Sequence, residues 1–332
     1  MKFIKKVGLL VGAMAISFSA MAEEITIGYQ GMFNPYKQII DEKMLEKQLG
    51  VTINWRRFDS GAKAMTALAS GSVDITSAGS SPIAAAVSNG VKAELFWILE
   101  NIGDAEAMVV RDGSGIMKPS DLKGKTIAVP FVSTTHFHTM FALEQFGIKK
   151  DEVKLLNMQP SAIYAAWQRG DIDAAFIWDP VLGQIKQSGH VLVTSKTLSS
   201  WGKPTFDGLV ANKKFAITHK AFLVDFVKMI ASVDKEYNDN KASFTSESPI
   251  AKSISKVTGG DVSTVPEVMA LYEYPSLKEQ ASCAWLGCGD KSGAVASLKA
   301  TSEFLLEQKK ISGLKDNYAE FVNSEYVDAA MK

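Results

Sequence analysis

Two serines stand directly before a proline in the run Gly79-Ser80-Ser81-Pro82, which follows the apolar stretch 73–78. Ser81 is a favoured N-cap residue and Pro82 is well tolerated at the first helical position, so the run predicts a strand followed at once by a helix. Unpaired backbone N–H groups and the positive end of the helix dipole would then lie beside two hydroxyls, which suits an oxygen-rich anion. A helix cap without a ligand is the alternative interpretation.

The same order of apolar stretch, N-cap residue and proline recurs in the second half of the chain. There the apolar stretch 174–178 leads to Asp179-Pro180, which matches Ser81-Pro82. Two copies of one βα unit predict two similar lobes whose helix starts face a shared cleft. In open α/β sheets ligands bind at the carboxyl ends of the strands, which is where both copies place their polar residues.

Strand and helix patterns alternate between residues 25 and 194, and helical patterns dominate after residue 212. This alternation predicts an α/β fold with mostly parallel sheets covered by helices. Asn34-Pro35 predicts the start of one helix that ends at Gly50. The late helices are expected to complete the first of the two lobes.

No long linker or low-complexity segment separates the two βα series. We expect a discontinuous first lobe, residues 23–109 and 208–332, and a second lobe, residues 110–207. Strands near 105–111 and 206–212 would form a hinge with two crossings. Such a hinge allows the lobes to close around a ligand.

The composition favours an ordinary two-domain protein. The 332 residues include 36 Lys+Arg and 36 Asp+Glu, and 46% are hydrophobic. A balanced charge provides no basic field to attract nucleic acid, so no nucleic-acid partner is expected.

The N-terminus has the pattern of a secretory signal peptide. Lysines precede an apolar run at 7–18, and residues 20–22 form an A-x-A cleavage site. The apolar run is too short to span a bilayer. We therefore predict a signal peptide at 1–22 and a soluble, exported mature chain.

Over essentially its whole mature length, the chain resembles the periplasmic solute-binding proteins of the nitrate/sulfonate/taurine ABC importers. The resemblance rests on the runs Trp55–Ala62, Ala67–Gly71, Gly79–Pro82, Ile127–His136, Ala165–Asp173 and Trp201–Asp207. It implies a type II periplasmic binding protein fold, with two βα lobes joined by a two-strand hinge. It also implies a monomer that binds taurine or a related small sulfonate and delivers it to an inner-membrane ABC permease, without cofactor or catalysis.

The resemblance assigns hydrogen-bond donors to the sulfonate of such a ligand. Hydroxyls and backbone N–H groups can satisfy sulfonate oxygens without burying a cation beside them. The expected donors are Gln30, Ser80, Ser81, Ser133, Thr134, Thr135 and His136. Plain N-capping is the alternative role for the two threonines.

Asp207 is the expected partner of the ligand's ammonium group, because a carboxylate in an apolar strand needs a partner. A salt bridge within the hinge is the alternative. Asp179 is a second candidate carboxylate in the cleft, with helix capping as its other possible role. Trp178 and Trp201 are expected to cover the ligand's ethylene chain or its ammonium, with core packing as the alternative.

Cys283 and Cys288 are the two cysteines of the chain, and export favours a disulfide between them. His136 and His138 are two residues apart, a poor spacing for zinc, so no metal is expected. Other alkylsulfonates, nitrate and thiamin precursors are alternative ligands. An enzyme on the same fold, such as a thiamin-pyrimidine synthase or a sulfinate hydrolase, is the alternative function.

Overall fold

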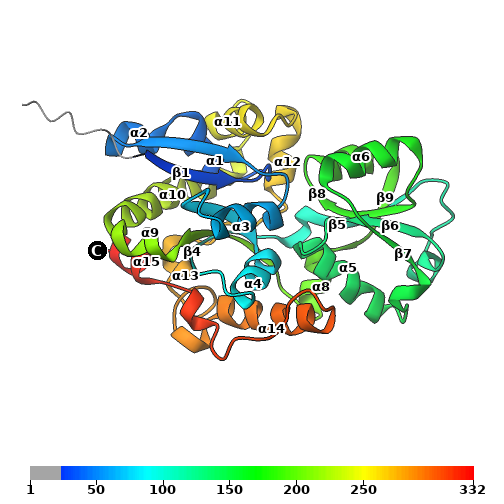
Figure 1. The fold of residues 1–332 in the computed structure, drawn as a ribbon. Helices are drawn as coiled ribbons and strands as arrows, with labels where there is room; N and C mark the ends of the chain where they lie inside the picture. The colour runs from blue at the N-terminus through cyan, green and yellow to red at the C-terminus, as the bar shows by residue number, and fades with distance from the viewer. Residues whose placement is uncertain (1–23) are drawn as a thin grey trace, which may run out of the picture.

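The computed structural model describes residues 24–332, and these form two α/β lobes that lie side by side (Figure 1). The signal peptide predicted at 1–22 lies outside the described residues. In residues 24–332 no helix combines the length and apolar character that crossing a bilayer requires.

The first lobe is built on a five-stranded sheet with the order β2-β1-β3-β10-β4. β1 pairs in parallel with β2 and β3, whereas β10 is antiparallel to both of its neighbours. The strands are β1 (Glu24–Tyr29), β2 (Thr52–Arg57), β3 (Ile75–Gly79), β4 (Ala93–Asn101) and β10 (Phe206–Asn212).

The second lobe repeats this plan with the order β7-β6-β8-β5-β9. β6 is parallel to β7 and β8, and β5 is antiparallel to β8 and β9. The strands are β5 (Glu106–Arg111), β6 (Thr126–Val129), β7 (Lys154–Asn157), β8 (Ala174–Trp178) and β9 (Gly189–Thr194). The antiparallel strand in each sheet, β10 or β5, is the first one after the chain crosses between lobes.

Helices cover the faces of both sheets (Figure 1). Those of the first lobe are α1 (Tyr36–Asp41), α2 (Met44–Leu49), α3 (Gly61–Ala69), α4 (Ser80–Ser88), α9 (Lys213–Thr218), α10 (Lys220–Asn240), α11 (Pro249–Thr258), α12 (Val265–Met269), α13 (Leu277–Gln280), α14 (Gly293–Glu307) and α15 (Glu325–Ala330). Those of the second lobe are α5 (Thr134–Gln145), α6 (Pro160–Arg169), α7 (Val181–Lys186) and α8 (Ser195–Ser200).

The helix predicted between Asn34 and Gly50 is two helices, α1 and α2. Lys43 separates them with a left-handed backbone (φ 52°), and Gly50 ends the second one as expected. Pro35 occupies the N-cap position of α1 rather than its first turn. The Asn34 side chain does not cap the helix, because it is hydrogen-bonded to the buried carboxyl of Glu100.

Both crossings between the lobes come a few residues earlier in the chain than the predicted boundaries. All of β5 pairs within the second sheet and all of β10 within the first, so the predicted division after residue 109 falls inside β5. The first crossing is the short 3-10 turn Gly103–Ala105, and the second is the segment 201–205. Gly103 and Asp104 mark this turn in the sequence, but the predicted division was placed inside the strand that follows it.

Each lobe has its own hydrophobic core, and α14 touches both lobes. Phe304 on α14 packs against the cores of the first and second lobes, edge-on to the ring of Phe137 at 4.8 Å. Figure 1 shows α14 running along the first lobe toward α5 and α8. The predicted disulfide between Cys283 and Cys288 is confirmed, and it lies in the connection that leads to α14.

Candidate functional site

A small cavity lies where the two lobes meet, at the carboxyl ends of strands from both sheets. Its volume is about 20 Å³, room for roughly one water molecule, so the two lobes are closely apposed here. Its lining is Gln30, Met32, Gly61, Gly79, Pro82 and Asp207 from the first lobe, with Glu106, Ser133, Thr134 and Trp178 from the second. The structure thus brings five of the predicted residues, Gln30, Ser133, Thr134, Trp178 and Asp207, to one space.

The first lobe contributes the start of α4. This helix begins one residue earlier than predicted, because Gly79 occupies the N-cap position and Ser80 is the first helical residue. Ser81 is therefore not the N-cap, and Pro82 is the third helical residue. Both serines are fully buried, and within residues 24–332 their hydroxyl oxygens have no hydrogen-bond partner. Two unpaired hydroxyls beside the free N–H groups of a first helical turn form an environment for an anion.

Gly79 allows the two lobes to approach at this point. A Cβ atom there would lie 2.9 Å from the Thr134 methyl carbon and 3.2 Å from Oδ1 of Asp207. Thr134 belongs to the second lobe and Asp207 to the first. The space between the lobes therefore tolerates no side chain at residue 79.

The second lobe contributes the start of α5, where Ser133 is the N-cap residue. Its hydroxyl oxygen accepts from the backbone N–H of His136 at 3.1 Å, and its hydroxyl donates to the carbonyl of Pro130 at 2.6 Å. Thr135 must then donate to Ser133, at 2.8 Å, because the hydrogen of Ser133 is already used. Thr134 donates to a carboxyl oxygen of Glu106 at 2.6 Å.

These bonds differ from the sequence expectation for Ser133, Thr134 and Thr135. Each of the three hydroxyl hydrogens already has an acceptor inside the protein, so none is free for a sulfonate in this arrangement. The sequence could not show this, because the acceptor of Thr134 comes from a distant strand. What α5 can offer an anion here is the backbone N–H groups of its first turn.

Asp207 lies at the wall of the cavity with only 6% of its surface exposed. The strand register pairs it with Glu100 on β4, and antiparallel partners place their side chains on the same face. Behind them Asn34 donates to both oxygens of Glu100, at 3.2 and 3.1 Å, and Lys37 donates to Asn34 at 3.1 Å. Burial raises the pKa of Asp207 to about 7, and Glu100 and Lys37 each oppose this rise.

The buried cation Lys37 is therefore shared between two carboxyl groups. Burial lowers its pKa to about 8, and Glu100 and Asp207 oppose that shift. Burial also holds the pKa of Glu100 well above its usual range, with Asp207 adding to the effect. The site thus holds two buried carboxyl groups and one ammonium, and a positive charge from a ligand beside Asp207 would favour ionisation of these carboxyls.

Glu106 is the site residue that sequence reasoning missed. It is 4% exposed and lies opposite Trp178 in the β5–β8 ladder, so both side chains point toward the cavity. Burial, followed by the nearby Asp207, raises its pKa to about 8. A glutamate at the start of an otherwise apolar strand was a usable signal, since such a group requires a partner.

Six of the predicted residues do not line the cavity: Ser80, Ser81 and Thr135, each next to a lining residue in the chain, and Asp179, His136 and Trp201. Asp179 is buried next to Trp178 but accepts from the backbone N–H of Gly183 at 3.0 Å, the helix-stabilising role that was its alternative. His136 stacks on Phe131 at 4.5 Å, and burial lowers its pKa to about 4. Trp201 is 46% exposed at the end of α8, so it covers no enclosed ligand in this structure.

Gln30 follows β1 and lines the cavity with its side chain largely buried. Its amide nitrogen lies 3.4 Å from the carbonyl of Ser77, a contact that uses one of its two hydrogens. The second hydrogen remains available to a ligand oxygen. No group of histidines, cysteines and carboxylates in residues 24–332 has the arrangement to hold a metal ion.

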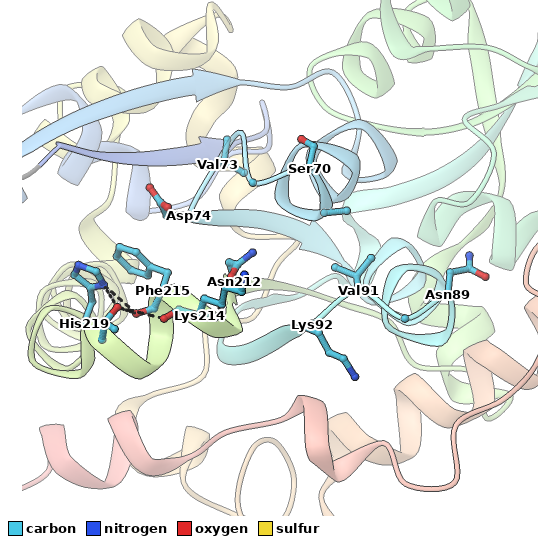
Figure 2. A pocket seen from close by; sticks show the side chains of 14 residues that line it. Ser70, Val73, Asp74, Asn89, Val91, Lys92, Asn212, Lys214, Phe215 and His219 are labelled. Carbon is cyan, nitrogen blue, oxygen red and sulfur yellow. Dashed lines mark hydrogen bonds between the residues drawn. The ribbon is translucent and has the colours of Figure 1, made fainter.

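A larger, more open hollow lies at the opposite end of the first sheet, shown in Figure 2. It is bordered by the turns that precede β3 and β4 and by the segment that follows β10. Asp74 in this hollow accepts from the backbone of Thr26 at 2.8 Å, which ties it to the sheet. None of the residues predicted to contact a ligand lines this hollow.

Known proteins match the sequence along most of its length. Residues 23–248 match a family model described as the substrate binding domain of ABC-type glycine betaine transport system. Over 320 residues the chain is 37% identical to the taurine-binding periplasmic protein of Escherichia coli (strain K12), covering 96% of this chain and 97% of that protein.

Solved structures share the two-lobed architecture. The alkanesulfonate-binding protein SsuA from Xanthomonas axonopodis pv. citri, bound to MOPS, superposes with a TM-score of 0.71 at 21% identity, covering 88% of this chain and 96% of that one. The desulfurization enzyme DSZB superposes with a TM-score of 0.63 at 13% identity, covering 93% and 99%. These likenesses confirm the predicted binding-protein fold, which hosts both binding proteins and an enzyme.

Proposed function

The chain belongs to the family of substrate-binding domains of ABC-type transport systems, and we propose that it captures taurine in the periplasm and delivers it to an inner-membrane ABC permease. It would act as a monomer after removal of residues 1–22. The 37% identity to a taurine-binding periplasmic protein supports taurine over other solutes of this family.

The observation that carries the proposal is that the start of α4 and the carboxyl of Asp207 meet at one small cavity. Gly79 and Pro82 line this cavity, and the buried, unpaired hydroxyls of Ser80 and Ser81 lie between them in the chain. The buried carboxyl of Asp207 lies on the wall between the same lobes. A sulfonate fits the first environment and an ammonium the second, so a short zwitterion satisfies both at once.

The cavity supports selectivity for an amine-bearing sulfonate. A plain alkylsulfonate would leave Asp207 buried without a positive partner from the ligand, and it would forgo the attraction between a buried carboxylate and an ammonium. Nitrate would fill only the anion side. We therefore propose that taurine binds more tightly than ethanesulfonate or nitrate.

The proposal involves no catalysis. Both cysteines are joined in the disulfide between Cys283 and Cys288, so neither is a nucleophile for the chemistry of a sulfinate hydrolase. His136 is stacked on Phe131 outside the cavity, with its pKa lowered by burial. These placements support binding over the enzymatic alternative.

Isothermal titration calorimetry tests the proposal with taurine, ethanesulfonate and nitrate. We expect taurine to bind with the highest affinity and to be recovered unchanged after incubation. Equal affinity for ethanesulfonate would refute the two-pole assignment, and a reaction product from taurine would refute the transport role.

A further inference from the structure

We propose that Glu106 is a second carboxyl partner for the ligand's ammonium, and that Ser195 and His138 behind it hold it protonated until the ligand enters. The inference rests on the proposed function, because it concerns the same cavity and an amine-bearing ligand. It assigns a selectivity role to Glu106, which was not among the residues predicted from the sequence.

The carboxyl of Glu106 ends a buried hydrogen-bond chain. One carboxyl oxygen accepts from Thr134 at 2.6 Å, and the other lies 3.2 Å from the hydroxyl oxygen of Ser195. Ser195 in turn lies 2.7 Å from Nδ1 of His138, whose Nε2 is 2.8 Å from the carbonyl of Lys203. The four residues whose side chains form this hydrogen-bond series are at least 96% buried: Glu106, Thr134, His138 and Ser195.

Counting hydrogens along this chain decides which group carries the proton. A carbonyl can only accept, so Nε2 of His138 must carry a hydrogen for the bond to Lys203. Burial lowers the pKa of His138 to about 4, so the ring is neutral and its Nδ1 accepts from Ser195. The single hydrogen of Ser195 is then used, and its oxygen can only accept from Glu106. A carboxylate has no hydrogen to donate, so Glu106 is protonated.

One other arrangement satisfies every hydrogen bond, and it has the same number of protons in different places. In it His138 carries hydrogens on both nitrogens, Ser195 donates to Glu106, and Glu106 is ionised. That state places an imidazolium in a fully buried position, which desolvation disfavours. The proton therefore resides on Glu106, on the side of the chain that faces the cavity.

The charged surroundings of Glu106 lead to the same protonation state. After burial, Asp207 raises the pKa of Glu106 further, and the hydrogen bond donated by Thr134 opposes that shift. A hydrogen bond donated by Ser195 would also oppose it, but in the arrangement derived above Ser195 accepts from Glu106 instead. Burial raises the pKa of Tyr272, a further titratable group on this side of the site, and nearby carboxyls, Glu106 among them, add to that shift. Burial raises the pKa of Asp207 and of Glu100, and the nearby Lys37 opposes both shifts. The side chains that shift the pKa of Glu106 are Asp207, Thr134 and Ser195, and none of the three is a cation.

A ligand ammonium would change this balance. Placed between Asp207 and Glu106, it stabilises the ionised carboxylates, and the proton of Glu106 passes to the solvent. Capture of taurine near neutral pH therefore releases protons, and affinity rises with pH up to the pKa of Glu106, about 8. A sulfonate without an amine leaves the proton in place, so its affinity shows no such dependence.

The decisive variant is Glu106→Gln, because an amide reproduces the protonated carboxyl. Its oxygen can accept from Thr134 and its NH2 can donate to Ser195, so the hydrogen-bond chain stays intact. Glu144→Gln is the matched control, since it removes an exposed carboxylate from α5 in the same lobe. Calorimetry at pH 7 in buffers with different ionisation enthalpies counts the protons released on binding.

We expect Glu106→Gln to release about one proton fewer per taurine than the wild type, while Glu144→Gln matches the wild type. The taurine affinity of Glu106→Gln should be about tenfold lower than the wild-type value at pH 8, and closer to it at pH 6. Ethanesulfonate affinity should be unchanged. Wild-type proton release and taurine affinity in Glu106→Gln would overturn the proposal.

Two ligand-free measurements separate this proposal from the choice of ligand. Infrared difference spectra between the wild type and Glu106→Gln at pH 7 should show a protonated carboxyl, and an ionised one would overturn the inference even if taurine binds. Ser195→Ala should reduce that protonated signal, whereas Ser200→Ala removes a hydroxyl from the same helix without contacting the chain. An unchanged signal in Ser195→Ala would refute the positioning role of Ser195. If the protonated signal is present but taurine does not bind, only the proposed ligand is wrong.

Discussion

Replacing Asp207 with asparagine tests the ammonium site most directly. The variant keeps the size of the side chain but removes a charge that is 6% exposed and backed by Glu100 and Lys37. Loss of one partner of a buried, hydrogen-bonded ion pair costs roughly 2–5 kcal/mol. Because Glu106 lines the same cavity and can supply a second negative charge, we expect the lower value. A loss of about 2 kcal/mol corresponds to a roughly 30-fold weaker taurine complex.

The assay is calorimetric titration of the wild type and Asp207→Asn with taurine and with ethanesulfonate. Ethanesulfonate has no ammonium, so its affinity should stay the same or rise as the unpaired carboxylate disappears. The preference for taurine should therefore shrink by about the same 30-fold factor. Asp239→Asn removes an exposed carboxylate from α10 and serves as the control. Taurine affinity within about threefold of the wild type in Asp207→Asn would refute the assignment.

Three further predictions follow from the same geometry. Gly79→Ala places a methyl group within 2.9 Å of a side-chain carbon on α5, so we expect weaker taurine binding and, in solution scattering, a more open shape than the wild type. Trp178→Ala should weaken taurine binding because Trp178 lines the cavity, whereas Trp201→Ala should leave affinity unchanged because Trp201 is 46% exposed; the reverse ranking in calorimetry would contradict the site. Replacing Cys283 and Cys288 with serine opens a short loop, which should lower the stability to unfolding by about 2 kcal/mol in thermal melts with taurine affinity retained.

Much of the fold could be predicted because its signals are local. Apolar strands followed by Gly, Ser or Pro, and helices ended by residues such as Gly50 and Gly170, mark βα units wherever they fold. The break at Lys43 was missed because a left-handed lysine has no sequence signature. The division between the lobes was placed too late because it was drawn within the hinge strands, although Gly103 and Asp104 mark the turn before β5.

The site was predictable in part. Ser80, Ser81 and Asp207 stood out because polar groups beside or within apolar strands need partners, and the structure buries all three. Trp201 had the residue type of a ligand contact but lies exposed, since burial depends on which elements pack over a side chain.

The sequence by itself determined the two βα lobes, the helix starts that suit an anion, and the disulfide, because each depends on residues close together along the chain. Only the tertiary structure decided which hydroxyls remain free. Thr134 donates to Glu106, 28 residues away, while Ser80 and Ser81 keep unpaired oxygens. It also decided that Glu106 and Asp207, from different sheets, share one cavity. Hydrogen-bond partners and desolvation arise when distant strands pack together, and local sequence patterns carry no information about that packing.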